Sequence, residues 1–324
     1  ECALGQATTD EECAYEQFFP LCEAGETMGC ITPTSMVRDG LKRGLAMEAE
    51  TGINAFKVGF IGSTDTHNAN PGDAEEYDYR GSAGVFSSPA AKRLSTDNPK
   101  RTQLLRNPGG LAAVWAHENT RDALFDSMKR REAYGTSGTR IQLRFFAGEA
   151  YSEAMLAAPD AIAQAYASGV PMGGDLRLPP DATPTFMVIA QMDPMSVPLD
   201  RVQVIKGWLA DGKAHERVTD VACSDGRQPG LRGRCPDLVA PVDLSNCSPS
   251  AGQGAGQLSA VWSDPDYDPA EHAFYYLRVL EIPTCRWSTY DALRLGQAPE
   301  QDLPATQQER AWSSPIWSRP PQRP

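Results

Sequence analysis

Apolar and polar positions along this 324-residue chain follow two different patterns. In the first half, a helical stripe over residues 36–51 precedes a short apolar run, residues 56–61, that is typical of a buried strand. Residues 111–116 and 141–146 predict two more strands, and a helix begins between them near Asn119. Helices that alternate with strands indicate an α/β sheet or barrel, although these strands are too few for a complete barrel.

After Pro179 and Pro180 the pattern changes to that of an all-β region. Turns rich in Asp, Gly and Pro divide the strand-like runs, and no strong helix intervenes, which is typical of an antiparallel β-sandwich. These runs cover residues 185–192, 201–209, 217–221, 257–262 and 273–282. The Pro-rich end of the chain carries Trp312 and Trp317, so we expect it to lie extended across the body, anchored by these rings.

The two patterns divide the chain into four parts. Residues 1–32 are a Cys-rich N-terminal extension, residues 33–178 an α/β region, residues 179–300 a β-rich domain, and residues 301–324 an extended Pro/Trp tail. Within the α/β region, the connection over residues 70–102 is too long for a simple link, and such loops often cover a site. We therefore expect α/β structure followed by an antiparallel β-sandwich-like domain.

The overall charge narrows the choice of partners. Acidic residues outnumber Lys and Arg by 42 to 30, which gives a formal net charge of −12. No stripe of basic residues suits a nucleic-acid backbone, and the negative charge disfavours an anionic membrane surface. The mean hydropathy of −0.42 predicts a soluble protein, and no apolar run approaches the roughly 18 residues that span a bilayer. We expect no nucleic-acid partner and no membrane span.

Eight cysteines fall into two clusters, one within the first 30 residues and one between residues 223 and 285. Their spacings contain no Cys-x2-Cys pair of the zinc-ribbon kind. Disulfide bonds within each cluster are therefore favoured over free thiols, although the connectivity cannot be deduced from sequence. This pattern predicts a periplasmic or secreted protein. The chain starts at Glu1 without a signal peptide, so we expect a mature, processed or truncated form.

Candidate chemistry follows the first predicted strand, where Asp65 and His67 stand two residues apart. In extended backbone the two side chains would point to one face, and a carboxylate oxygen and an imidazole nitrogen are both metal donors. The alternative is an Asp that caps a loop beside a polar His. The acidic residues of the next loop are more typical of a solvated surface than of further ligands; they are Asp73, Glu75, Glu76 and Asp78.

Two more polar groups accompany the later strands. Glu118 follows the second predicted strand and is either a ligand or base, or an acid that interacts with a helix N-terminus. Ser137, Thr139 and Arg140 lie in a polar turn, where amides, hydroxyls and a guanidinium would suit an anionic substrate. An ordinary turn with Arg140 in a structural ion pair is the alternative.

Four segments, taken together, resemble the bacterial domain-of-unknown-function 3604 family. They are FKVGFIGSTDTHN from residue 56, VWAHENTR from residue 114, YGTSGTR from residue 134 and YLRVLEIPT from residue 276. The resemblance covers residues 33 to about 318. This family in turn resembles the polymerase-and-histidinol-phosphatase (PHP) metallohydrolases, which have a distorted β/α barrel and a cluster of divalent metals.

The resemblance implies a partial PHP-like barrel over residues 33–178. Asp65 and His67 match a late Asp-x-His pair of metal ligands, which implies a metal and catalytic role for both and a divalent cofactor such as zinc, manganese or calcium. Glu118 is a further catalytic candidate. His117 stands where the family pattern has an acid, either as a substitute ligand or as a neutral replacement. PHP enzymes also use an early His-x-His motif, which this chain lacks.

The chain therefore resembles the C-terminal portion of a metal-dependent hydrolase that acts on a phosphoester, a small anionic substrate. An N-terminal fragment or companion chain would supply the missing ligands. One alternative is a non-catalytic binding or structural protein that keeps the scaffold. Another is a subunit that completes its site with a separate N-terminal chain.

Overall fold

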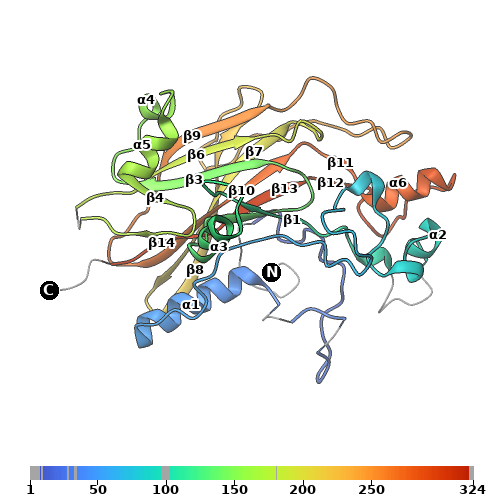
Figure 1. Cartoon of the computed structure of the whole chain (residues 1–324), viewed down its shortest axis with the longest axis horizontal. Coiled ribbons are helices and arrows are strands. Elements are labelled where there is room, and N and C mark those ends of the chain that lie inside the picture. Colours follow the sequence, from blue (N-terminus) through green and yellow to red (C-terminus); the bar gives the residue numbers. More distant parts are fainter. Residues whose placement is uncertain are drawn as a thin grey trace.

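Apolar side chains along long strands build two mainly antiparallel sheets, which pack face to face (Figure 1). The computed structural model describes residues 8, 10–27, 29–32, 35–95, 103–179 and 181–320. In this part of the chain the larger sheet has eight strands and the smaller sheet has four. A separate two-stranded ribbon is formed by β11 (Thr284–Cys285) and β12 (Thr306–Gln307).

The larger sheet joins strands from distant parts of the sequence. Its long strand β10 pairs with β7 on one side and with β13 and β14 on the other. β13 also pairs with β2, β2 with β1, β7 with β8, and β14 with β5, the last pair in parallel. In chain order the strands are β1 Leu111–Val114, β2 Ala133–Thr136, β5 Asp175–Leu176, β7 Leu199–Ala210, β8 Lys213–Cys223, β10 His272–Glu281, β13 Arg310–Ser313 and β14 Ile316–Ser318.

The smaller sheet has the order β4, β3, β6, β9. Its inner face shares one core with the larger sheet: the ring centroid of Phe186 lies 5.6 Å from that of Phe145 and 4.6 Å from that of Tyr275, which belongs to β10. Stacked and tilted rings at such distances stabilise the interface between the sheets. The strands are β3 Gln142–Gly148, β4 Gly169–Pro171, β6 Thr185–Gln191 and β9 Gln257–Ser263.

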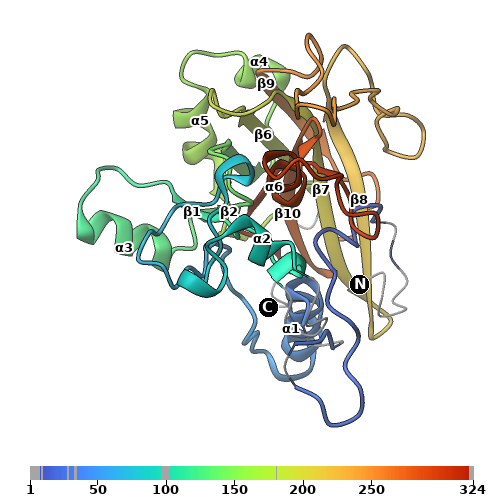
Figure 2. The same ribbon diagram turned by 90° about the vertical axis from the view of Figure 1, so that its right-hand side faces the viewer.

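Helices cover the outer faces of the sandwich (Figures 1 and 2). Leu41 and Leu45 of α1 pack on Phe274 and Trp317 of the larger sheet, and α4 and α5 cover the smaller sheet. The α-helices are α1 Val37–Thr51, α2 Ala90–Arg93, α3 Arg121–Lys129, α4 Glu153–Leu156, α5 Ala161–Ser168 and α6 Trp287–Arg294. Three 3-10 turns are η2 Glu76–Asp78, η3 Gly84–Phe86 and η4 Gln103–Leu105.

The strands expected after residue 179 are present as β6 to β10, and the expected helices near residues 36 and 119 are α1 and α3. The tail is extended, as expected, but it is part of a sheet. β13 lies between β2 and β10, and the Trp317 side chain in β14 is only 1% exposed. Residues 287–294 form α6, which the sequence patterns did not predict.

The strand expected over residues 56–61 is absent, and this prediction is wrong. The chain there lies flat on the outer face of the larger sheet, where glycines permit a very close approach. A Cβ atom on Gly135 of β2 would lie 2.7 Å from the nitrogen of Gly62, and one on Gly59 would lie 2.9 Å from Ser314 Oγ. Because an apolar run can pack on top of a sheet as well as within it, composition does not distinguish the two cases.

Both sheets are open in the described part of the chain, and their strands close into no barrel. The expected partial barrel over residues 33–178 is therefore not found, and that part of the fold prediction is corrected to a mixed fold with large antiparallel sheets. The physical reason is long-range pairing. β1 and β2 extend the larger sheet through β13, and β3 pairs with β6, so strands from both sides of residue 178 share each sheet.

Three disulfide bonds connect described cysteines, and each lies within one of the two expected clusters. They are Cys22–Cys30, Cys223–Cys235 and Cys247–Cys285. Disulfides persist in oxidising compartments, which fits a protein of the cell exterior or of another oxidising space. In the described part of the chain, each helix is too short or too polar to cross a bilayer.

Candidate functional site

The backbone of the loop that carries Asp65 is tied to the start of β1. Gly62 N donates a hydrogen bond to Leu111 O at 3.1 Å, and Gly110 N donates one to Ser63 O at 2.9 Å. Reciprocal bonds of this kind fix the chain direction at the point where the loop leaves the sheet. The loop therefore projects from a rigid base.

The far side of the loop is held by the long connection that follows it. His67 N donates to Ser82 O at 2.7 Å, and Asn68 Nδ2 donates to Gly81 O at 2.6 Å. Asp65 itself has a φ angle of 47°, in the left-handed region. The extended Asp-x-His geometry that the sequence suggested is thus wrong, because the backbone turns at Asp65. A left-handed residue other than Gly is often found at a functional site.

Both candidate metal ligands are exposed to solvent. Among the described residues, neither the Asp65 carboxylate nor the His67 imidazole takes part in a hydrogen bond or ion pair; only the two backbone N–H groups do. Most exposed carboxylates on tight turns bond to a nearby amide. Within the described residues these two side chains have no hydrogen bond or ion pair, so both are available to a ligand.

A cavity of about 850 Å³ opens beside Asp65. Its walls carry several hydrogen-bonding side chains, among them Ser82, Gln103, Arg106 and Asn107. His67 is not part of the cavity wall. The cavity thus combines one uncommitted carboxylate with a guanidinium and amide groups, a mixture suited to a polar, anionic molecule with an associated cation.

Arg106 lines the same cavity and was not predicted as a site residue from the sequence. Its backbone oxygen accepts hydrogen bonds from Arg286 Nη2 and from Trp287 Nε1, both at 2.8 Å. Its side chain is exposed, and among the described residues its guanidinium has no hydrogen bond or ion pair. The only sequence signal is its position two residues before the Pro108 turn that enters β1.

Glu118 lies beyond the opposite end of β1 from the Asp65 loop, because that loop contacts the start of the strand. Glu118 and His117 are exposed and line a separate hollow. Glu118 Oε1 accepts from Thr120 Oγ1 at 3.1 Å, and Thr120 caps α3. This is the helix N-terminal position that was the alternative interpretation of Glu118. The geometry does not bring Glu118 together with Asp65.

Ser137 and Arg140 lie in the turn after β2, apart from both Asp65 and Glu118, and their polar groups contact acidic side chains. The Ser137 hydroxyl donates to the Glu309 carboxylate, and Arg140 N donates to Asp193 Oδ2 at 2.7 Å. The Arg140 guanidinium lies 3.5 Å from the Glu75 carboxylate, which is the structural ion pair considered as an alternative. The Asp193 and Glu75 carboxylates beside this turn repel an anion.

Thr139 lines a cavity of about 280 Å³ together with Glu76 and Glu309. Burial raises the pKa of Glu309 to about 8 and that of Glu281 to about 8, and burial also raises the pKa of Glu76 well above its ordinary value. In the described part of the chain none of these three glutamates has an ion pair. They are therefore a buried, largely protonated group rather than an anion site.

The donor set for a metal ion is incomplete among the residues that the structure describes. In the described ranges, no three His, Cys, Asp or Glu side chains are placed so that they could hold a metal ion together. Asp65 and His67 would supply two donors, whereas a catalytic zinc site has three protein ligands. The residues present fit part of a metal site and not a whole one.

Comparison with known proteins identifies one family. No curated protein and no solved structure matches the chain significantly. Residues 1–320 match the family described as "Protein of unknown function (DUF3604)", so the match includes the Cys-rich N-terminal segment. The chain therefore belongs to the DUF3604 family of proteins of unknown function.

Proposed function

We propose that this chain supplies Asp65 and His67 to the site of a metal-dependent hydrolase that acts on a phosphoester. The observation that carries the proposal is the loop itself: its backbone is fixed on both sides, while its carboxylate and its imidazole are exposed and uncommitted. The resemblance of the segment to PHP metallohydrolases supports the same assignment.

Each residue has a distinct role in this proposal. A divalent ion, when bound, lowers the pKa of a bound water towards neutrality and so provides a nucleophile. Asp65 offers a hard oxygen donor, and His67 offers an imidazole nitrogen. Arg106 faces the same cavity as Asp65 and would pair with phosphoryl oxygens, for which a planar guanidinium is well suited.

The proposed site requires donors beyond Asp65 and His67, since two ligands hold a divalent ion weakly. An N-terminal fragment or a companion chain would bring them, and zinc, manganese or calcium would be the ion. Glu118 has no part in the reaction as proposed, because β1 separates it from Asp65. Ser137, Thr139 and Arg140 are likewise assigned to structure, because Glu309, Asp193 and Glu75 already bond to the polar groups of their turn.

A second candidate is a binding or structural protein without catalysis. The incomplete donor set favours it, because a scaffold that has lost a site would also show uncommitted ligands. The two candidates differ in one respect: only the hydrolase needs Asp65 and His67 to bind a metal when the full assembly is present.

The test is a titration of the full chain, purified in its native assembly, with Mn²⁺ and then Zn²⁺. We expect Asp65→Ala and His67→Ala each to weaken metal binding by at least about tenfold, which is about 1.4 kcal/mol. Glu118→Ala is the matched control, an exposed acid at the other end of β1, and should bind like the wild type.

Activity is then measured on p-nitrophenyl phosphate and bis(p-nitrophenyl) phosphate. We expect Asp65→Ala to abolish any metal-dependent hydrolysis and Arg106→Ala to raise KM more than it lowers kcat. Unchanged hydrolysis in Asp65→Ala would remove Asp65 from the mechanism. Absence of metal at Asp65 and His67 in the saturated native assembly would favour the non-catalytic alternative.

A further inference from the structure

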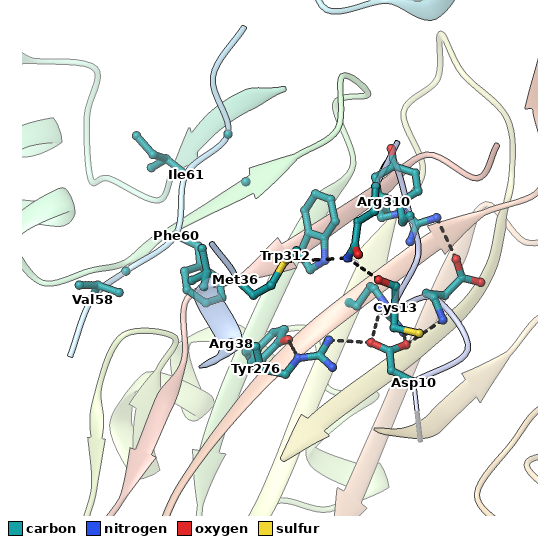
Figure 3. Close-up of a pocket in the computed structure, with 18 residues that line it drawn as sticks. Asp10, Cys13, Met36, Arg38, Val58, Phe60, Ile61, Tyr276, Arg310 and Trp312 are labelled. Carbon is teal, nitrogen blue, oxygen red and sulfur yellow. Dashed lines mark hydrogen bonds and ion pairs between the residues drawn. The ribbon is translucent and has the colours of Figure 1, made fainter. Parts of the chain in front are cut away.

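Two hollows of this molecule differ in how their charged side chains are paired. In the groove of about 540 Å³ on the outer face of the larger sheet, each arginine is matched by a carboxylate, and Figure 3 shows the Arg38 guanidinium directed to Asp10. Arg278 pairs with the same Asp10 at 2.6 Å, and Arg310 pairs with Glu12 at 3.1 Å. The cavity of about 280 Å³ beside the turn after β2 is different, because most of its carboxyl groups have no ion pair in the described part of the chain.

The described lining of this smaller cavity contains four acidic side chains and one basic side chain. The acids are Glu75, Glu76, Asp193 and Glu309. The base is Arg140, whose guanidinium lies 3.5 Å from the Glu75 carboxylate. The other three acids have no ion pair among the described residues, and each is less than a tenth exposed. Because a carboxylate is costly to bury without a cation, the cavity lacks positive charge.

The arginines behind the cavity wall do not supply this positive charge. Burial, followed by the nearby Glu309 and Glu16, raises the pKa of Glu76 well above its ordinary value, and Arg286 opposes this rise only in part. Arg286 itself pairs with Glu16 at 2.9 Å, and Arg310, which lies close to Glu309, has the carboxylate partner already described. Both guanidinium groups are therefore matched by carboxylates outside the cavity.

Hydrogen-bond donors are also too few in this cavity. Glu76 Oε2 accepts a hydrogen bond from Trp287 N, but Glu76 Oε1 has no hydrogen bond in the described part of the chain. Thr139 Oγ1 is buried and lies near Glu281, yet its geometry makes no hydrogen bond. Buried polar side chains without a partner are rare in folded proteins. Two such oxygen atoms in the lining of one cavity point to a ligand that brings hydrogen-bond donors.

The remaining lining of the cavity suits a short alkyl chain. Ala74 and Val197 are buried apolar residues, and Tyr290 adds an aromatic ring. Met195 lines the same cavity and is 82% exposed, so the cavity reaches the protein surface. Its volume lies near the lower end of the range for small-molecule sites. It shares no lining residue with the cavity beside Asp65, so the two are separate sites.

We propose that this cavity binds a small alkylamine, whose ammonium group pairs with the Glu76 carboxylate and donates a hydrogen bond to Thr139 Oγ1. An ammonium group supplies a positive charge and three N–H donors, both of which the cavity lacks. A metal ion fits less well, because in the described ranges no three His, Cys, Asp or Glu side chains are placed to hold one. The ammonium group pairs with the ionised form of Glu76, so binding releases a proton. The inference does not depend on the metal site proposed at Asp65.

The test is isothermal titration calorimetry of the full chain with butylammonium chloride at pH 8. We expect butylammonium to bind at least about tenfold more tightly than 1-butanol, which has a similar shape and no charge. It should also bind more tightly than butyltrimethylammonium, which keeps the charge and loses the N–H donors. The affinity should rise from pH 6 to pH 8, and the heats in phosphate and in HEPES should differ because the buffer takes up the released proton.

Variants identify the residues that bind the amine. Glu76→Gln removes the charge and keeps an oxygen atom for Trp287 N, so it should weaken binding at least about tenfold and reduce the proton release. Thr139→Val has a similar volume and should also weaken binding, which keeps the proposal testable if Glu76→Gln does not fold. Asp65→Asn is the control and should bind butylammonium normally, so a failure of the metal site is distinguished from a failure of the amine site.

Several results would overturn the inference. Equal binding of 1-butanol would show an apolar pocket in which Glu76 has no role. Unchanged affinity in both Glu76→Gln and Thr139→Val would place the amine elsewhere on the protein. Binding of N-acetyl-lysine methylamide without binding of butylammonium would assign the cavity to a lysine side chain of another protein. Absence of binding between pH 6 and pH 8 would show that protonation alone compensates for the burial of these acids.

Discussion

Asp65 and Glu309 both lie near the start of β1, but they differ in burial and in hydrogen-bond partners. Asp65 is exposed, and its carboxylate has no partner in the described part of the chain. Glu309 is 5% exposed, and its carboxyl group accepts hydrogen bonds from the Ser137 hydroxyl and, at 2.7 Å, from Gln307 Nε2. A buried acid with two donors fixes structure, whereas an exposed acid with none is free to bind a ligand.

Arg286 supports the wall of the Asp65 cavity from the buried side. The guanidinium is fully buried; it donates to Arg106 O at 2.8 Å beside the Asp65 cavity, and it pairs with Glu16 at 2.9 Å. The next residue, Trp287, donates its backbone N–H to the buried Glu76 carboxyl. The buried network thus fixes one wall of the cavity, whereas the Asp65 loop is held by its own backbone bonds to residues 81–82 and 110–111.

Among single substitutions, the largest expected effect is that of Arg286→Ala. The substitution leaves Glu16 buried without its cation and removes one of the two hydrogen bonds to Arg106 O, so we expect a loss of about 3–5 kcal/mol in the free energy of unfolding. Urea denaturation followed by circular dichroism measures it. Arg43→Ala is the control, because the Arg43–Asp39 pair is exposed at the surface and should cost no more than about 0.5 kcal/mol. Similar losses in both variants would contradict the structural role of Arg286.

The next effect is a pH dependence of stability that comes from the buried region. The pKa of Glu281 and that of Glu309 are about 8 in the folded chain, against 4.5 for an ordinary Glu. Between these values the folded state binds more protons than the unfolded state, so stability falls as pH rises, by up to about 1.4 kcal/mol per pH unit for each carboxyl. The contribution is complete below pH 4.5 and is lost as pH passes through 8.

Urea denaturation at intervals from pH 5 to pH 8.5 tests this dependence. Glu309→Gln should make the slope shallower, since the variant cannot titrate. Its amide can be accommodated because Gln307 Oε1 is buried without a hydrogen bond, so a flipped Gln307 can accept from the new amide. Asp65→Asn should leave the slope unchanged. A stability that rises over this pH range would contradict the raised pKa values.

Much of the β-structure was predictable from sequence, because β6, β7 and β10 are apolar, β-branched or aromatic runs bounded by turn residues. The burial of Glu309 was not. It depends on the pairing of the tail strand β13 with β2, which are separated by more than 170 residues and whose partnership no local pattern encodes. The tail was expected only to lie extended across the body, anchored by Trp312 and Trp317.

The candidate site was predictable only in part, for a different reason. The position of Asp65 and His67 past an apolar run was visible in the sequence, and their exposure is consistent with ligand binding. The left-handed backbone at Asp65 was not visible, because Asp tolerates that conformation without a Gly signal. Arg106 was missed because only the fold brings η4 beside the Asp65 loop.

The smallest expected effect on stability is that of Asp65→Asn. This variant tests whether Asp65, unlike the buried Glu309, contributes little to the stability of the fold. Asn adopts a left-handed φ angle as readily as Asp, and no hydrogen bond of the Asp65 carboxylate is lost, so we expect a change within about 0.5 kcal/mol. The same variant should lose metal binding in the native assembly, because an amide is a weaker donor than a carboxylate. Denaturation and an Mn²⁺ titration on one preparation measure both properties. A stability loss above about 1 kcal/mol would show that Asp65, like Glu309, stabilises the fold. The contrast between a structural Glu309 and a ligand-binding Asp65 would then be wrong.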